Sequence, residues 1–392
     1  MGKVLLLNAG YTEIPLIEEL KKMGYYVVTS GLRPNYPGHK LADQYIEADY
    51  SDKDAILKIC KDEHMDGIIS CAFDLGMVTT CYVAEQMGWK GHDTYENTMR
   101  IHQKDLMMDM CEELGIPSPK GKYFSEEKGA ISFLNQVEYP IIVKAVDQSS
   151  GIGINKANNE TEATIAIRDA FEKSKEKRIL IEEYIEGHQE SINAFVVNGK
   201  VICAVTCDCY SPINPYLIQT ETLMSMNYEW VKDELIKVIE KMFSTLHLVD
   251  GIITLQYLVK DHRPYVIDMM RRCLGNRYLI AAEAITGFPW HKALILSELG
   301  KDCSKLESKK PRGKYTGHHA IMATRNGIYR GMDIPKEINK CVFELHELFE
   351  NGQEIRNHLS ERLGYIYYTY DTREELDYAA LHFNDMIKLN IE

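Results

Sequence analysis

The chain has 392 residues, of which 45% are hydrophobic and 26% are charged, the composition of a globular protein with apolar residues enough for two or three domains. The formal net charge of −13, with no basic stripe, excludes a broad surface for nucleic acids or anionic membranes. A local basic pocket for one phosphorylated ligand remains compatible with this charge.

Ten cysteines are scattered along the chain without the spacing of a zinc or redox site. The nearest cluster, Cys203, Cys207 and Cys209, falls in a strand-like run and is predicted to pack rather than bind metal. Dispersed thiols without a secretory signal indicate a cytoplasmic protein. The short apolar run at residues 4–7 leads directly into a folded pattern, so we predict a buried strand there and no signal or membrane segment.

Residues 1–95 alternate apolar strands with amphipathic helices. This pattern predicts a parallel doubly wound sheet, a Rossmann-like domain. The turn after the first strand carries only Gly10. The GxGxxG spacing of a dinucleotide site is absent, so we do not predict NAD binding.

A single helix is predicted over residues 96–115, where Gly115 followed by Pro117 gives a stop signal. Strands and helices then alternate without repeats to about residue 300. The charged, proline-containing segment 301–312 is predicted to be a linker, and the remaining residues mix strands with helices.

Residues 253–272 (ITLQYLVKDHRPYVIDMMRR) read as two strands joined by a tight polar turn. Gln256 and Asp268 stand where each strand should be apolar, and Arg272 follows the second strand. A buried carboxylate is costly unless a cation or hydrogen bonds hold it. Oxygen donors closed by an arginine suit Mg²⁺ and a polyphosphate, although a hairpin with its polar face in water has the same pattern.

Lys144 lies inside an apolar strand just before a loop of small residues, Ser149, Ser150, Gly151 and Gly153. A lysine in this position contacts a ligand phosphate or extends to solvent. The backbone N–H groups and hydroxyls of the loop could fold over phosphates, and a simple hairpin turn is the alternative. No GKS or GKT follows, so this is not a Walker loop.

The run ILIEEYIEGHQES carries Glu182 and Glu183 where a hinge between lobes is expected. Backbone groups and a carboxylate there could bind the adenine amino group, with Ile185 against the ring. Glu190 begins the next strand. A solvated glutamate at a strand end is the alternative for each of these acids.

These stretches, in this order, resemble the ATP-grasp superfamily in its biotin-carboxylase, carbamoyl-phosphate-synthase-like and carboxylate–amine ligase branch. The resemblance covers nearly the whole chain and implies an α/β (α+β grasp) fold. It assigns a Rossmann-like pre-ATP-grasp domain to residues 1–95, a connecting helix to 96–115, the small lobe to 116–185, the large lobe to 186–310 and a small mixed domain to 311–392.

The resemblance also implies roles for individual residues. Lys104 and Lys144 would contact the ATP phosphates, and Ser149–Gly153 would be a mobile flap over them. Glu182, Glu183 and Ile185 would line the adenine pocket, and Glu190 would face the ribose. Gln256 and Asp268 would hold Mg²⁺, with Mn²⁺ as the alternative ion. Arg272 and Arg277 would be catalytic and Arg271 would bind substrate, because the basic loop RRCLGNR follows the metal strand.

One position departs from the family pattern. The second metal strand of the family usually reads Glu-x-Asn-x-Arg, and here Asp268 and Met270 replace the two metal ligands. A thioether is too soft a ligand for magnesium. The departure puts a two-metal site in doubt without affecting ATP binding.

Three functions are compatible with these residues. The first is an ATP-dependent ligase that activates a small carboxylate as an acylphosphate for attack by an amine. The second is a bicarbonate-activating carboxylase or carbamoyl-phosphate-type enzyme. The third is a non-catalytic ATP-binding protein with an altered metal site. The resemblance implies small-molecule substrates and a homodimer. His318 and His319 could face the acceptor or simply begin a strand.

Overall fold

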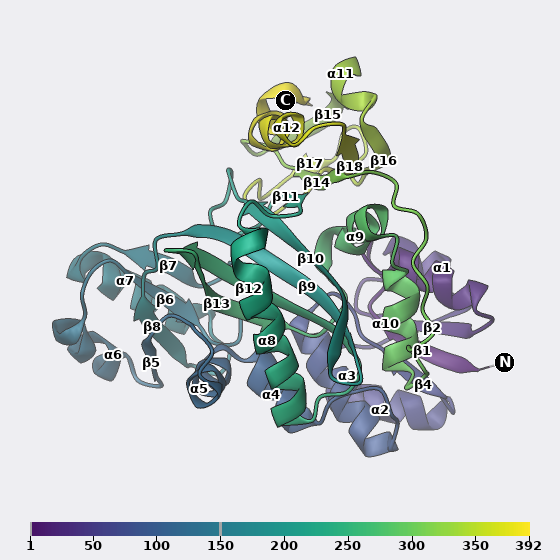
Figure 1. Cartoon of the computed structure of the whole chain (residues 1–392), viewed down its shortest axis with the longest axis horizontal. Helices are drawn as coiled ribbons and strands as arrows, with labels where there is room; N and C mark the ends of the chain where they lie inside the picture. The colour runs from purple at the N-terminus through teal and green to yellow at the C-terminus, as the bar shows by residue number, and fades with distance from the viewer. Residues whose placement is uncertain (1, 149–150) are drawn as a thin grey trace.

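The computed structural model describes residues 2–148 and 151–392. Within these residues the strands form four sheets, and Figure 1 shows three parts around the largest of them. The N-terminal sheet lies at the right of the view, a small lobe carrying α6 and α7 at the left, and the C-terminal residues at the top. The mixed α/β architecture that the sequence predicts is confirmed.

The N-terminal sheet is parallel, with strand order β3-β2-β1-β4. Its two faces are both buried, because Leu5 and Leu7 of β1 pack in one apolar cluster while Val4 and Leu6 pack in another. The elements are β1 Lys3–Leu7, α1 Ile14–Lys22, β2 Tyr26–Gly31, β3 Gln44–Glu47, α2 Lys53–Asp62, β4 Gly67–Ile69 and α3 Asp74–Met87.

The prediction of one helix over residues 96–115 is wrong. Helix α4 (Tyr95–His102) ends at Gln103, which has extended backbone angles, and α5 (Lys104–Leu114) begins directly after it. The break has a tertiary cause: the Gln103 side chain donates to Glu176 at 2.7 Å, and Lys104 Nζ donates to the carbonyl of Gln148 at 2.6 Å. The start of α5 is thereby held against the small lobe.

The small lobe is an antiparallel sheet of order β5-β8-β6-β7. Its elements are β5 Gly121–Phe124, α6 Glu127–Phe133, β6 Ile141–Ala145, β7 Ile154–Ala157, α7 Glu160–Lys173 and β8 Ile179–Glu183. Alternate residues Ile141 and Val143 pack under α7. Because side chains alternate across a strand, the intervening Ile142 and Lys144 are left for the opposite face.

The largest sheet has eight strands in the order β13-β12-β9-β10-β11-β14-β18-β16. Helix α8 covers one face, and α9 and α10 pack in the cluster on the other. The strands and helices are β9 His188–Val197, β10 Lys200–Tyr210, β11 Thr220–Leu223, α8 Tyr228–Leu246, β12 Gly251–Lys260, β13 Arg263–Met270, α9 Tyr278–Thr286, α10 Trp290–Glu298, β14 Tyr315–Ile321, β16 Val342–Glu347 and β18 Gly364–Tyr370. This sheet therefore crosses the boundary expected at residue 310.

The predicted hairpin of residues 253–272 is present as β12 and β13. Asp261 and His262 form its two-residue turn, both with positive φ, the geometry that matches the twist of paired strands. This register sets Gln256 directly opposite Asp268.

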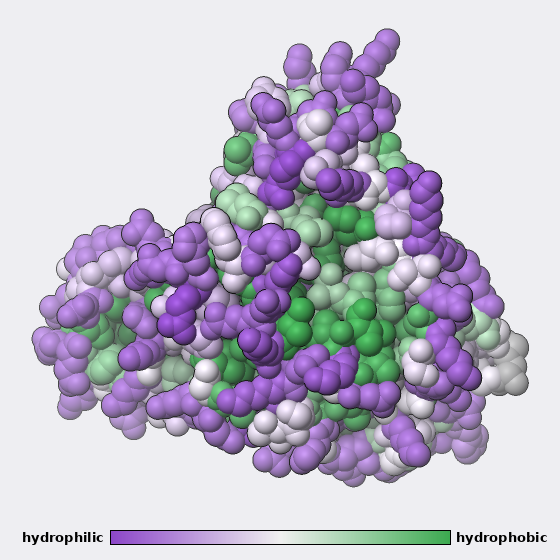
Figure 2. Space-filling view, in the orientation of Figure 1, coloured by the Kyte–Doolittle hydropathy of each residue, from purple (hydrophilic) through white to green (hydrophobic). Residues whose placement is uncertain are grey.

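The C-terminal residues add a three-stranded sheet, β17-β15-β19, beside the large one. Its remaining elements are β15 Gly327–Asp333, α11 Lys336–Asn339, β17 Glu354–Ile355, α12 Arg373–Met386 and β19 Lys388–Ile391. Figure 2 shows polar residues over the outer parts of this face of the molecule and apolar residues gathered near its middle. Among the described helices, none is long and apolar enough to span a membrane.

Candidate active site

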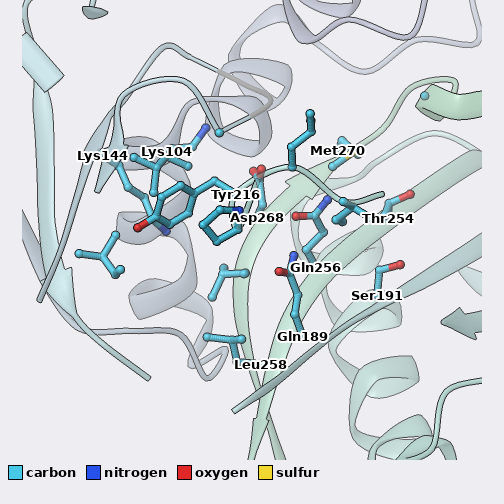
Figure 3. A pocket seen from close by; sticks show the side chains of 18 of the residues that line it. Lys104, Lys144, Gln189, Ser191, Tyr216, Thr254, Gln256, Leu258, Asp268 and Met270 are labelled. Carbon is cyan, nitrogen blue, oxygen red and sulfur yellow. The ribbon is translucent and has the colours of Figure 1, made fainter. Parts of the chain in front are cut away.

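A cavity of about 500 Å³ lies between the small lobe and the large sheet. Figure 3 shows side chains from both sides converging on it, with Lys104 and Lys144 on one side and Gln256, Thr254 and Met270 on the other. Segments far apart in the sequence thus meet in one site, as the order of the motifs predicts.

The outer end of the cavity is apolar and follows the segment that joins β8 to β9. Glu182, Glu183 and Ile185 all line it. The carboxylate of Glu183 is used internally, since it accepts a hydrogen bond from the backbone N–H of Lys120 at 2.8 Å. Apolar side chains from both lobes complete the slot: Ile142, Ile154, Leu258 and Ile267. Apolar side chains on both sides of this part of the cavity suit an aromatic ring such as adenine.

Two buried lysines point into the cavity from the small-lobe side. Lys144 forms an ion pair with Glu182, with 2.5 Å between Nζ and the carboxylate oxygen. Burial raises the pKa of Glu182, although Lys144 and Lys104 oppose that rise. Lys156, which the sequence analysis missed, also lines the cavity and lies 3.7 Å from the centre of the Tyr184 ring. Together these cations make this wall suited to phosphate groups.

The small-residue loop reaches the cavity at Gly151. Its φ is +77°, and a Cβ there would lie 2.6 Å from the backbone oxygen of Tyr216 in the large lobe. Ser149 and Ser150 lie outside the described residues. Gly153 does not line the cavity; it packs at the base of the loop, beside Ala145. The prediction that Gly153 contacts phosphate is therefore corrected to a role in shaping the loop.

Gln256 and Asp268 lie opposite each other at the cavity wall. Asp268 accepts a hydrogen bond from the N–H of Met269 at 3.1 Å and is in no ion pair among the described residues. Its carboxylate is therefore free to bind a cation. The next pair on the same face of the hairpin is Thr254 and Met270, so the thioether does occupy the position where the family has an oxygen ligand. The donor set fits one magnesium ion, with hard oxygens from a carboxylate and an amide.

Arg272 lines the cavity but is held by a carboxylate from the N-terminal domain. Its guanidinium donates to both oxygens of Asp74, at 2.7 and 3.2 Å, and His102 bonds the same acid at 3.0 Å. Although burial would raise it, the pKa of Asp74 is held well below its usual range by Arg272 and His102. The sequence analysis missed Asp74, whose only signal is its place just after a parallel strand.

Two predicted arginines do not face the cavity. Arg271 is buried on the opposite side of the chain from Arg272, paired with Asp93 at 3.1 Å. Arg277 lies 3.7 Å from the centre of the Tyr11 ring and donates to the Tyr11 carbonyl at 2.8 Å. The predicted substrate role of Arg271 and catalytic role of Arg277 are therefore wrong. Both side chains instead connect their segment to the N-terminal residues, Arg271 through Asp93 and Arg277 through Tyr11.

Glu190 does not line the cavity either. Its carboxylate is fully buried on the face covered by α8, where it accepts hydrogen bonds from Asn227 and from Tyr257, the latter at 3.0 Å. Burial raises the pKa of this acid. Because side chains alternate along a strand, its neighbours Gln189 and Ser191 line the cavity instead. The predicted ribose contact is therefore not made by Glu190.

The deep end of the cavity has polar residues that the sequence analysis missed. Ser191, Asn193, Glu221 and Tyr278 line it. His318 contacts this end indirectly, since its Nε2 lies 2.6 Å from Glu221, whereas His319 bonds Thr220. These polar residues lie on separate strands and a helix, and their positions in the sequence do not show that they share one cavity.

Comparison with known proteins identifies the fold. Residues 102–214 match the family model for the phosphoribosylglycinamide synthetase ATP-grasp (A) domain. The L-amino acid ligase of Bacillus licheniformis has a similar structure, with a TM-score of 0.83 at 16% identity, covering 100% of this chain and 99% of that one.

Two relatives are similar in sequence. The formate-dependent phosphoribosylglycinamide formyltransferase of a Nitratiruptor species is 25% identical over 51% of this chain and 53% of its own length. The carbamoyl phosphate synthase large chain of a Thermoanaerobacter species is 26% identical over 74% of this chain and 30% of its own length. Each alignment thus spans about half or less of the relative.

The family match, the relatives and the architecture agree with the resemblance found in the sequence. Residues 102–214 thus match an ATP-grasp domain family, and the whole chain has the fold of the L-amino acid ligase.

Proposed function

We propose that the protein is an ATP-dependent ligase. It activates a small carboxylate as an acylphosphate, which an amine then attacks, releasing ADP and phosphate. The observation that supports this most directly is the free Asp268 carboxylate opposite Gln256, facing the buried lysines 104 and 144 across the cavity.

In this proposal the adenine ring occupies the apolar slot at Ile185 and the phosphates extend toward Lys104 and Lys144. An Mg²⁺ ion held by Asp268 and Gln256 would supply charge stabilisation for the transferred phosphoryl group. Lysine contacts neutralise phosphate charge, and Asp74 positions Arg272 beside the same region.

The covalent steps need no nucleophilic side chain. A carboxylate oxygen of the substrate attacks the γ-phosphorus, and the bond to the β–γ bridging oxygen breaks with release of ADP. The amine nitrogen then attacks the acyl carbon, and the bond between that carbon and the oxygen bridging to phosphorus breaks. Phosphate leaves with the bridging oxygen, and the amine loses a proton to solvent. The protein contributes position, charge and exclusion of water.

A second candidate uses bicarbonate as the activated acid. It is supported by the similarity to a carbamoyl phosphate synthase large chain over 74% of this chain. The Met270 thioether favours the third candidate, a non-catalytic ATP-binding protein, because it replaces one oxygen ligand.

The test is a screen for ADP release with Mg²⁺ and ATP against amino acids, dicarboxylates and amines, singly and in pairs, with bicarbonate as a separate arm. We expect release that requires both an acid and an amine. Release with bicarbonate alone would support the second candidate. ATP that raises the melting temperature without ADP release from any combination would support the third.

A control experiment tests whether the cavity binds ATP rather than NADH. Mg²⁺ and ATP should raise the melting temperature, because a ligand that binds only the folded state stabilises it. NADH at the same concentration should not. Stabilisation by NADH and not by ATP would contradict the assignment of the cavity to ATP.

A further inference from the structure

A row of hydrogen-bonded side chains crosses the deep end of the cavity. It begins at Thr254 Oγ1, which donates to Asn193 at 2.7 Å, and Asn193 lies 3.5 Å from Ser191. The row then passes over β10 to β11 and β14: Ser191 Oγ lies 2.9 Å from Cys207 Sγ, Cys207 Sγ lies 3.1 Å from Glu221, and Glu221 lies 2.6 Å from His318. Five neighbouring strands contribute one or two polar side chains each.

These side chains are almost completely buried. Burying a polar group costs free energy unless hydrogen bonds or a ligand compensate for the lost water. Of the row, Thr254, Asn193, Ser191 and Glu221 line the cavity. Tyr278 lines it too, and its hydroxyl is buried with no hydrogen-bond partner among the described residues. An unpartnered buried hydroxyl and a buried carboxyl group in the lining of one cavity indicate a built recognition site.

Among the described residues of this row, Glu221 is the acidic side chain that lines the cavity, and it is paired with His318. Burial raises the pKa of the Cys207 thiol well above its usual range, so Cys207 is a neutral donor to Glu221. Among the described residues that line the cavity, the five strands of the row supply no lysine or arginine. The lining cations come from other segments: Lys104, Lys144, Lys156, Arg272 and Arg362. Because Glu221 lines the cavity, a cationic ligand group can approach its carboxyl oxygens.

Glu221 is also remote from the proposed site of phosphoryl transfer. Strands β12 and β11 are separated by three strand-to-strand steps in the sheet. At about 4.8 Å for each step, the backbones of Gln256 and Glu221 are roughly 14 Å apart. A ligand group bound at Glu221 would therefore lie away from the reacting atoms, where it contributes to recognition of the substrate.

We propose that Glu221, held by His318 and Cys207 and assisted by the Tyr278 hydroxyl, binds a positively charged amino group of the substrate, distal to the reacting carboxylate or amine. This deepens the proposed function and rests on it. The substrate class is a small acid or amine with a second, terminal ammonium group, and phosphorylated sugars are disfavoured at this end.

The test compares ligand pairs that differ only in a terminal ammonium group: lysine with norleucine, and 1,4-diaminobutane with butylamine. Binding is measured by calorimetry with Mg²⁺ and a non-hydrolysable ATP analogue, and ribose 5-phosphate serves as the anionic probe. We expect at least one charged member to bind about tenfold or more tightly than its neutral partner, as a charge-assisted hydrogen bond predicts.

Two variants test whether Glu221 causes the preference for the charged ligand. Glu221→Gln keeps the size and a hydrogen-bonding oxygen, so it should remove the preference for the charged member while leaving affinity for the ATP analogue unchanged. Glu347→Gln, at an exposed position on β16 of the same sheet, should keep the preference. Equal binding within every pair, tighter binding of ribose 5-phosphate, or an unchanged preference in Glu221→Gln overturns the proposal.

The two proposals can fail separately. If charged ligands bind through Glu221 but no combination releases ADP, the specificity site stands and the ligase assignment fails. If ADP release occurs only with neutral or phosphorylated substrates, the ligase assignment stands and the role of Glu221 is wrong.

Discussion

Asp268 is a carboxylate whose only hydrogen-bond donor in the described residues is the N–H of its own neighbour, Met269. Facing an amide across the hairpin, it has the position and the unused oxygens of a metal ligand. The second oxygen ligand of the family pattern, an asparagine, is replaced by Met270, so Asp268 is the one hard ligand that this strand can offer a metal ion.

Asp268→Asn should lower the rate of ADP release by about a hundredfold or more, since a preorganised charge at the phosphoryl group contributes on that scale. ATP binding should persist, because the lysines and the adenine slot are untouched. The measurement is the Mg²⁺ dependence of ADP release with an active substrate pair. Asp261→Asn, in the exposed turn of the same hairpin, is the matched control. Full activity in Asp268→Asn would contradict the metal assignment.

Lys144→Ala should weaken ATP binding by about 1.5–3 kcal/mol, the size of a lost charge-assisted hydrogen bond. Removing the lysine also leaves the buried Glu182 carboxylate without its partner. The double variant with Glu182→Gln removes that complication. If the lysine contacts phosphate, calorimetry should show weak ATP binding in both variants; recovery of affinity in the double variant would mean that Lys144 serves only to neutralise Glu182.

At the scale of elements, the two-residue period of strands decides which side chains reach the cavity. Gln189 and Ser191 of β9 face it while Glu190 packs beneath α8. The same alternation sends Met270 and Arg272 to the cavity and Arg271 away from it. A predicted strand therefore offers two alternating sets of side chains, one for each face of the sheet. The face on which a helix packs decides which set can reach the cavity.

The loop between β6 and β7 meets the loop that carries Tyr216 from the large lobe. Gly151→Ala should weaken ATP binding about fivefold or more, because alanine at φ +77° is strained and its Cβ would lie 2.6 Å from the Tyr216 backbone. Gly129→Ala in α6 is the control, since the nearest atom to its Cβ would be 3.7 Å away. Equal ATP affinity in wild type and Gly151→Ala would show that this contact does not shape the nucleotide site.

At the scale of the whole molecule, buried acids tie the N-terminal domain to the rest. Asp74 of α3 reaches Arg272, and Glu298 at the end of α10 accepts hydrogen bonds from the backbone N–H and hydroxyl of Ser70, the former at 2.6 Å. These contacts hold the N-terminal sheet against the large lobe, which keeps Asp74 at the candidate active site.

Glu298 makes stability depend on pH. Burial raises the pKa of this carboxyl from 4.5 to about 7, against the opposing hydrogen bonds of Ser70, so the folded protein holds the proton more tightly than the unfolded chain. Its stabilising contribution is fully present below pH 4.5 and is lost as the pH rises through about 7.

Between pH 5 and pH 8 the wild type should therefore lose about 1–3 kcal/mol more stability than Glu298→Gln, which cannot ionise. The measurement is the denaturation midpoint of both proteins across this range. Glu307→Gln, at an exposed position of the linker segment, should behave as wild type. An identical pH profile in wild type and Glu298→Gln would contradict a raised pKa.

The sequence by itself determined the features that depend on residues close together in the chain, such as strands, helices and the hairpin. Alternating strands and helices gave the parallel N-terminal sheet, and the pattern around the Asp261 turn gave the hairpin that sets Gln256 opposite Asp268. The order of the lysine, hinge and hairpin motifs was enough to indicate a resemblance to the ATP-grasp superfamily, because each motif is local and the chain connects them in one direction.

Only the tertiary structure decided which side chains share the cavity. Asp74 and Arg272 are 198 residues apart, and the pair exists because α3 begins beside the end of β13. Glu221 and His318, 97 residues apart, meet only because β11 and β14 are neighbours in the sheet. Buried charges need partners, and partners so distant in sequence leave no local pattern, so the paired arginine and the acidic end of the cavity became visible only in the folded chain.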